Sequence, residues 1–205
     1  MEGGRVPPPL SAFQLPRGRH GIPPEQVVES QRWRLLGAVG EALAERGYAR
    51  TRVADVAARA GVSRGTIYEL FGDLPACLLA AYEMAADCVC DLADSARESG
   101  GGCEVSLRAA LEEILRFLAE EPSFAHLLGA EAAAGVPAIA AARERFVDRL
   151  TGMEVERRPV EGALALVSEW VAGGKTDRLP ELAAQLAELI YPAGAGRPPR
   201  DAPAM

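Results

Sequence analysis

The chain has 205 residues, of which 49% are hydrophobic and 25% are charged, the composition of an ordinary globular protein. This length predicts one domain of moderate size, or a small domain beside a larger one. No apolar run approaches the ~20 residues that span a bilayer, and the N-terminus has no secretory signal, so we expect a cytoplasmic protein without membrane contact. The four cysteines fit neither a disulfide framework nor a zinc site.

The net charge of -7 is unevenly distributed along the chain. Residues 1–72 contain ten arginines and seven acidic residues, a net charge of +3. Residues 73–205 contain twelve basic and twenty-two acidic residues, a net charge of -10. Because phosphate binding depends on the local field, a basic N-terminal third keeps nucleic-acid binding open despite the acidic total.

Proline and glycine divide the chain into segments. Six of the fifteen prolines lie in residues 1–24 and four follow Tyr191, which predicts flexible tails over residues 1–24 and 192–205. Between the tails Ala, Leu, Glu and Arg dominate and alternating β-branched runs are absent, which predicts an all-α fold of about nine helices. The expected helices cover residues 25–46, 52–59, 63–70, 74–98, 104–120, 122–134, 137–151, 159–173 and 179–191.

Residues 48–71 carry the strongest functional signal. A short helix begins near Thr51, whose hydroxyl can cap it, and places the small Ala57 where a second helix would cross. Gly61 can take the left-handed conformation that ends a helix, and Ser63 can cap the next one, whose Ile67 continues the buried face. Two short helices joined by a glycine turn predict a helix-turn-helix, whose second helix enters the DNA major groove.

This segment resembles the tetracycline-repressor (TetR) type of bacterial transcriptional regulators. The matching residues are Gly47, Tyr48, Thr51, Val53, 55–57, 60–68, Phe71 and Leu78. The close match covers roughly residues 32–82, under a third of the chain. The resemblance implies a homodimer that binds DNA through its first three helices, encloses a small-molecule pocket with the next four and dimerises through the last two. Residues 25–72 are then a helix-turn-helix DNA-binding domain, and residues 73–191 a helical ligand-binding and dimerisation domain.

Two departures from the family pattern concern phosphate contacts. Leu74 stands where the family usually has a lysine at the start of the fourth helix, and Pro75 removes a backbone N–H from that helix terminus. Leu70 replaces the Tyr or His that commonly precedes the phenylalanine. These differences predict a weaker hold on the DNA backbone, which the arginines of the N-terminal tail would offset by reaching a groove or phosphates.

The expected DNA-binding residues are Arg34, Thr51, Arg52, Ser63, Arg64, Gly65, Thr66 and Tyr68. Arg64 begins the recognition helix, where contact with a base or phosphate competes with the role of an ordinary solvated charge. Thr66 and Tyr68 suit phosphate or thymine-methyl contacts. Arg34 and Arg52 face either the DNA or a surface ion pair.

The helices after residue 73 are amphipathic, which predicts a core and, through the resemblance, a pocket wall. The expected ligand-binding residues are Tyr82, Met84, Phe117, His126 and Phe146. Their apolar character predicts a small hydrophobic effector that is uncharged or weakly cationic. The helix over residues 159–173 is apolar nearly all round, so we expect a symmetric partner to cover one side of it. The expected dimer residues are Leu164, Val167, Trp170, Val171, Leu182, Leu186 and Ile190.

The sequence contains no Ser-His-Asp set, P-loop or H-E-x-x-H motif and only two histidines, so we expect neither an enzyme nor a metal or cofactor site. The cysteines are expected to be buried small hydrophobes, with thiol sensing as the alternative. The sequence thus predicts a dimeric, ligand-responsive repressor of a palindromic operator. Two alternatives stay open: a helix-turn-helix regulator without a small-molecule inducer, and a helical ligand-binding or enzymatic protein whose motif is only structural.

Overall fold

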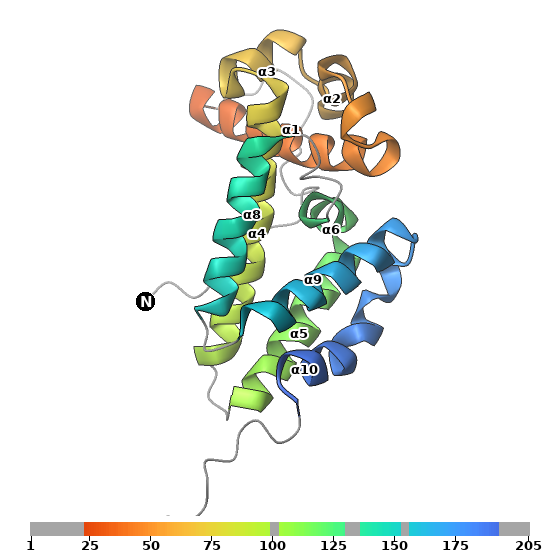
Figure 1. Ribbon diagram of the computed structural model, residues 1–205. Coiled ribbons are helices and arrows are strands. Elements are labelled where there is room, and N and C mark those ends of the chain that lie inside the picture. The colour runs from red at the N-terminus through yellow and green to blue at the C-terminus, as the bar shows by residue number, and fades with distance from the viewer. Residues whose placement is uncertain (1–22, 99–102, 130–135, 153–155, 193–205) are drawn as a thin grey trace, which may run out of the picture.

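The computed structural model describes residues 23–98, 103–129, 136–152 and 156–192. Over these ranges the regular structure is helical, without a strand, which confirms the all-α prediction (Figure 1). The nine α-helices of the described residues are α1 (Pro24–Arg46), α2 (Val53–Ala60), α3 (Arg64–Phe71), α4 (Leu74–Glu98), α5 (Cys103–Glu120), α6 (Pro122–Leu128), α8 (Pro137–Thr151), α9 (Arg157–Ala172) and α10 (Ala183–Ile190). Two 3-10 helices lie between them, η2 (Tyr48–Arg50) and η3 (Thr176–Leu182).

Seven of the nine predicted helices begin and end within two residues of the observed ones. The prediction over residues 179–191 is wrong as a single α-helix, because Pro180 has no N–H to donate and the chain forms η3 before α10 begins. The helix predicted over residues 122–134 ends at Leu128, where the N–H of Gly129 donates to two carbonyls of the last turn, and residues 130–135 lie outside the described chain. The predicted tails also lie almost wholly outside it.

The helices form a small head on a longer body (Figure 1). Helices α1, α2 and α3 make the head, and α4 runs from the head down the length of the body. Helix α8 lies beside α4 and parallel to it, while α5, α9 and α10 pack on the other side, with α6 directly beneath α1. The head is therefore connected to the body both through α4, which follows the helix-turn-helix in the chain, and through the α1–α6 contact.

The contact between α1 and α6 depends on a glycine. A Cβ atom on Gly40 would lie 3.1 Å from the Cβ and the carbonyl oxygen of Ser123, and 3.2 Å from the Leu127 side chain. These separations are below ordinary van der Waals contact, so the two helices approach more closely here than any larger residue allows. Helix α6 consequently rests directly on the backbone of α1.

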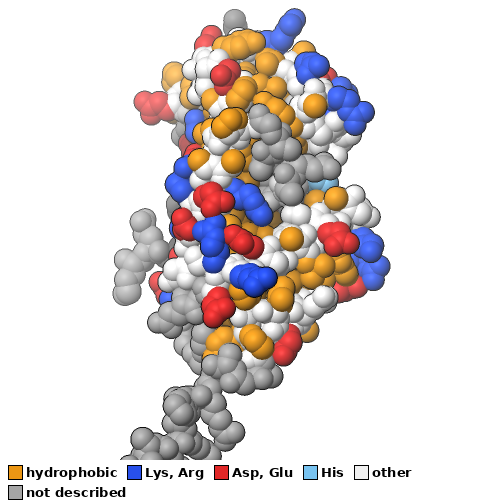
Figure 2. All heavy atoms as spheres, viewed as in Figure 1, with side chains coloured by type: hydrophobic (Ala, Val, Ile, Leu, Met, Phe, Trp, Pro, Cys, Tyr) orange, Lys and Arg blue, Asp and Glu red, His pale blue; other side chains and the backbone are white. Residues whose placement is uncertain are grey.

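Ion pairs hold α8 against its neighbours. Arg145 pairs with Glu83 at 2.9 Å and Arg149 with Asp87, which joins α8 to the exposed edge of α4. Arg157, at the start of α9, pairs with residues of α8 and with its own helix. Figure 2 shows these interleaved basic and acidic side chains on the face formed by α4, α8 and α9. Each such exposed pair contributes at most ~1 kcal/mol, so the ladder mainly sets the register of the helices.

Candidate DNA interface and effector cavity

The helix-turn-helix has the geometry that its residues predict. Helix α2 ends at Gly61, whose φ of 63° and ψ of 37° are left-handed, and the N–H of Val62 donates to the Ala57 carbonyl at 3.0 Å. Ser63 begins α3 as its cap, because its Oγ accepts a hydrogen bond from the Thr66 N–H at 3.1 Å. Both predicted roles, the glycine turn and the serine cap, are confirmed.

The predicted cap at Thr51 is wrong, and its side chain does not face a DNA surface. Thr51 is buried, and its hydroxyl donates to the Gly47 carbonyl at 2.9 Å. The carbonyls at the end of α1 have no partners within that helix, so they compete successfully for the hydroxyl. Asp55 performs the capping instead, since its Oδ2 accepts the Arg52 N–H at 3.1 Å.

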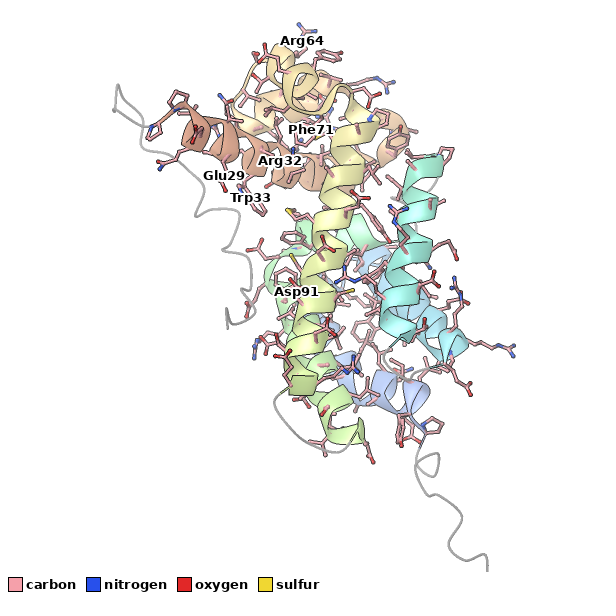
Figure 3. All side chains as sticks on the ribbon, turned by 90° about the vertical axis from the view of Figure 1, so that its left-hand side faces the viewer. Glu29, Arg32, Trp33, Arg64, Phe71 and Asp91 are labelled. Carbon is pink, nitrogen blue, oxygen red and sulfur yellow. The ribbon has the colours of Figure 1, made fainter. Side chains whose placement is uncertain are left out.

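Helix α3 presents one face to solvent at the end of the head. Arg64, Gly65 and Tyr68 are exposed, with Tyr68 at 55%, while Ile67 on the opposite face is fully buried. Figure 3 shows Arg64 at the outer end of the head, directed away from the body. Thr66 is half-buried, and its hydroxyl lies 3.0 Å from the Ser63 Oγ. Arg64, Gly65 and Tyr68 are thus accessible to a DNA groove, and Glu69 is exposed beside them.

Arginines in the head divide into two groups. Arg46 pairs with Asp55 at 3.0 Å, and Arg59 pairs with two glutamates of α1, so both hold α1 to α2. Arg64 and Arg52, in contrast, form no ion pair with the described residues; Arg52 donates to the Ala49 carbonyl at 3.0 Å and stays exposed. Positive charge therefore remains available on the recognition helix and at the start of α2.

Two further arginines of α1 support the head from beneath. Arg34 is half-buried under the turn of the motif, where its Nη1 would lie 3.6 Å from a Cβ on Gly61, and its buried Nε has no hydrogen-bond partner among the described residues. Arg32 lies over the ring of Phe71 at 4.9 Å from the centroid, as Figure 3 illustrates. Arg34 therefore packs against the turn, and its predicted DNA contact is not visible in its present position.

The N-terminus of α4 is already occupied. The Asp73 Oδ1 accepts the Ala76 N–H at 2.7 Å, and the Cys77 N–H donates to the Asp73 carbonyl. Pro75 has no N–H, and Leu74 is half-buried. A phosphate would meet a nearby carboxylate and fewer open N–H donors, which agrees with the weaker backbone contact that the sequence predicts here.

A cavity of about 300 Å³ lies in the body between α4, α5, α6, α8, α9 and α10. Its wall is apolar except for Arg97, Ser106 and Ser168. The Ser168 hydroxyl is already used, because it donates to the Leu164 carbonyl at 2.8 Å. A volume of this size is at the lower end of the range for small-molecule sites.

Of the five predicted ligand-binding residues, only Phe146 lines this cavity. Tyr82 is 1% exposed, and burial raises the pKa of its phenol to about 12. The residues of α4 that line the cavity begin at Val89. Tyr82 and Met84 precede Val89 and lie nearer the head. Phe117 packs against a neighbouring ring at 5.2 Å, and His126 lies on the part of α6 outside the wall. This cavity therefore lies lower in the body, farther from the head, than the predicted ligand-binding residues.

Arg97 is a cavity residue that the sequence reasoning missed. It continues the four-residue row of Val89 and Ala93 on α4, so the spacing alone placed it on the same face. The five expected ligand-binding residues include no arginine, so they do not account for this part of the wall.

The predicted dimer residues face inward. Leu164, Val167, Leu186 and Ile190 line the cavity, while Val171 and Leu182 are buried in the core of the same chain. Trp170 is half-buried, with the Lys175 ammonium 5.3 Å and the Arg178 guanidinium 5.8 Å from its ring centroid. The apolar excess of α9 is thus explained within one chain, because a helix that borders a cavity needs apolar residues on that side.

A different face of α9 and α10 is open to solvent. Gly162 and Ala165 on α9 are exposed, Leu166 is half-buried, and Leu189 on α10 is 41% exposed. A Cβ on Gly162 would lie 3.5 Å from the Leu189 side chain, so these residues adjoin one another. We call this set the outer α9–α10 face.

Three thiols of the described chain lie in its interior. Cys77, Cys88 and Cys90 are buried, and burial raises the pKa of their thiols to about 12, 12 and 11. They are therefore neutral at physiological pH and behave as small hydrophobes. Within the described ranges no group of His, Cys, Asp and Glu can hold a metal ion, and no helix is long and apolar enough to cross a membrane.

Comparison with known proteins shows which family model and which solved structures the chain resembles. Residues 35–81 match the model of the family described as bacterial regulatory proteins, tetR family. No curated protein sequence matches the chain. The fatty acid degradation regulator FadR from Bacillus halodurans is 19% identical, with a TM-score of 0.67 over 83% of this chain and 96% of that one.

Two further solved structures share the fold. FadR from Bacillus subtilis, in complex with stearoyl-CoA, is 18% identical, with a TM-score of 0.66 over 78% of this chain and 98% of that one. A TetR family regulator from Marinobacter aquaeolei is 21% identical, with a TM-score of 0.62 over 81% and 98%. Residues 35–81 are therefore similar to the N-terminal domain of the tetR family of bacterial regulatory proteins, and the chain has the fold of solved TetR family transcriptional regulators.

Proposed function

We propose that this chain is a homodimeric transcriptional regulator that binds a palindromic operator and releases it when a small hydrophobic effector fills the cavity. One observation carries the proposal. Helix α6 contacts α1 of the head through Ser123 and Leu127, and it lines the cavity through Ala125 and Leu128. A ligand in the cavity and a DNA duplex on the head would therefore act on the same short helix.

The DNA part of the proposal rests on α3. Its exposed face carries Arg64 and Tyr68, and it has no steric obstruction from the body. In helix-turn-helix dimers the two recognition helices enter successive major grooves about one turn, ~34–36 Å, apart. A twofold dimer then requires a palindromic site.

The dimer part rests on the outer α9–α10 face. Small residues such as Gly162 and Ala165 let two helix pairs approach closely, and Leu189 supplies exposed apolar area. A twofold arrangement places the same face of two chains together. The inward residues that the sequence predicts for this role would then support the interface from behind.

The effector part rests on linkage between the cavity and the head. A ligand shifts DNA affinity only if it binds one conformation better than the other. Filling the cavity changes the packing of α6 on one side while Gly40 fixes its distance from α1 on the other. The Bacillus subtilis FadR complex, which holds stearoyl-CoA, supports an apolar ligand for a body of this fold.

The test is selection of bound duplexes from a random library, followed by binding isotherms for the wild type and for Arg64→Ala. If Arg64 contacts a base, the variant loses ~1–3 kcal/mol and discrimination at one position per half-site. If it contacts phosphate, all sequences weaken alike and the salt slope falls by about 0.9. Arg116→Ala replaces an exposed arginine of α5, outside the helix-turn-helix, and as the control it keeps the wild-type isotherm. Failure to select any duplex would contradict the proposal.

A further inference from the structure

The charged and polar groups of the cavity wall indicate which effector it takes. We propose that the cavity binds a free medium-chain carboxylic acid, with its carboxylate at Arg97 and Ser106 and its alkyl chain directed toward α6. This inference rests on the proposed function, because it names the effector class of the same cavity.

Arg97 and Ser106 lie at the same end of the cavity. Arg97 is in the last turn of α4 and Ser106 in the first turns of α5, and these two helices pack side by side and antiparallel (Figure 1). Both side chains line the cavity. The acid-binding end is consequently the end farthest from the DNA-binding head.

Ser106 supplies a hydroxyl to the cavity wall at this end. The residue is 9% exposed and its side chain lines the cavity. A hydroxyl group can donate one hydrogen bond and accept two. A ligand oxygen at this end would accept a hydrogen bond from it.

The ion pair of Arg97 leaves N–H donors of its guanidinium available for a ligand. Its guanidinium carries five N–H donors, and its ion pair with Asp94 spans 3.6 Å with both side chains about half exposed. Exposed pairs of this kind are weak, so a carboxylate at the cavity end can share or replace Asp94 as the partner.

Exposed acidic residues around this end limit the charge of the ligand. Asp94 and Glu98 lie on the last turns of α4, and Glu104 lies at the start of α5. Because three carboxylates and one arginine leave this end net negative, the several phosphate charges of a coenzyme A ester would be repelled, and a single carboxylate binds only through direct pairing with Arg97. The chemistry therefore favours the free acid over the thioester found in the Bacillus subtilis FadR complex.

The size of the cavity sets the length of the alkyl chain. A cavity of about 300 Å³ is at the small end of the range for small-molecule sites, which favours a medium-length alkyl chain over a long one. The α5 wall runs from Ser106 to Leu118, which is ~18 Å along a helix. Its far end adjoins α6, so the length of the chain decides whether a ligand presses on the helix that contacts α1.

Isothermal titration with decanoate, decanol and decanoyl-CoA tests the assignment. Decanoate is expected to bind the wild type at least tenfold more tightly than decanol and than decanoyl-CoA. Arg97→Gln should weaken decanoate at least tenfold and leave decanol unchanged. Arg116→Gln removes an exposed arginine of α5 that pairs with Glu113 outside the cavity, and it should bind decanoate like the wild type.

Several outcomes overturn the assignment: no decanoate binding, equal binding of decanol and decanoate, tighter binding of decanoyl-CoA, or an Arg97→Gln variant that binds decanoate normally. A matched circular-dichroism melt establishes that each variant is folded. Titration of operator duplex separates this inference from the regulatory proposal. Arg97-dependent binding that leaves operator affinity unchanged upholds the ligand and contradicts the regulation; intact operator binding without decanoate binding overturns the ligand alone.

Discussion

At the residue scale, single side chains decide whether an exposed group is free for DNA or is used by the fold. Ser63 and Thr51 are both hydroxyl residues beside the helix-turn-helix, yet Ser63 caps α3 and Thr51 bonds back to the end of α1. Leu74 and Asp73 close the N-terminus of α4, where a lysine and open N–H groups would otherwise meet a phosphate. The DNA surface is therefore concentrated on α3.

Restoring a cation at position 74 should strengthen DNA binding. We expect Leu74→Lys to raise affinity for every duplex and to steepen the dependence of log K on log salt by about 0.9, because one more phosphate is neutralised. Isotherms at several salt concentrations measure both quantities. Leu74→Met, which adds no charge, serves as the control, and an unchanged salt slope in Leu74→Lys would mean that this helix end does not approach the backbone.

Removing the cap of α3 should lower stability separately from DNA affinity. Ser63→Ala leaves the Thr66 N–H without its acceptor and should cost ~1 kcal/mol in the free energy of unfolding. Ser63→Asp retains the cap and should keep the stability, but its charge should weaken operator binding. Urea unfolding and DNA isotherms on both variants measure the two effects, and equal stability of all three proteins would show that the cap contributes nothing.

At the element scale, α6 is the shortest of the α-helices described in the body, and it lies between the head and the cavity. One side rests on α1 at Gly40, and the other side closes the cavity. Close packing transmits displacements because a tightly packed contact cannot deform without moving its neighbours. Helix α4 makes the second connection, and its ion pairs with α8 make the two helices move together.

Enlarging Gly40 should disturb this contact. Gly40→Ala places a methyl 3.1 Å from the Ser123 carbonyl oxygen, so we expect an overpacking cost of ~1–3 kcal/mol and a smaller effect of the effector on operator affinity. Adding Ser123→Gly removes one of the two backbone-proximal contacts and should recover part of both losses. The measurements are thermal unfolding and operator titration with and without ligand. If the effector changes operator affinity as much in a destabilised Gly40→Ala protein as in the wild type, this contact does not transmit the effect of the effector.

At the scale of the whole molecule, the interior of the body is a cavity wall and the outer α9–α10 face is the surface left for a second chain. The inward set that the sequence predicts for dimerisation borders the cavity or lies in the core. Subunit association and effector binding thus share α9 and α10 on opposite faces. A ligand that spreads these helices would also alter the distance between the two recognition helices of a dimer.

A charge on the outer face should dissociate the dimer. We expect Leu189→Glu to give monomers in sedimentation velocity and to lose operator affinity, because an unpaired carboxylate at an apolar contact is costly. Val105→Glu is the matched control, since Val105 is 67% exposed on α5, away from this face. Val167→Glu should instead destabilise the body through a charge in the cavity. A Leu189→Glu protein that remains dimeric would place the interface elsewhere.

The sequence by itself determined the elements and the motif. Prolines at helix starts, Gly61 in a left-handed turn and the four-residue spacing of apolar residues are local features, and local features follow from the chain's own stereochemistry. The all-α class, seven helix ranges and the roles of Gly61 and Ser63 were predictable for that reason. The face of α3 was predictable as well, because Ile67 marks the buried side and leaves Arg64 and Tyr68 outside.

Only the tertiary structure decided which side of each helix meets the core, the cavity or solvent. An apolar stripe on α9 shows that burial is needed but does not name the neighbour, so Val167 and Leu164 could not be assigned to the cavity from their spacing. The place of Arg97 depended on the end of α4 where α5 turns back. The hydroxyl of Thr51 turned to the carbonyls of Gly47 and Ala42 at the end of α1 instead of to the helix that follows it. Each of these outcomes is set by competition between surfaces from separate segments, and that competition exists only once the chain is folded.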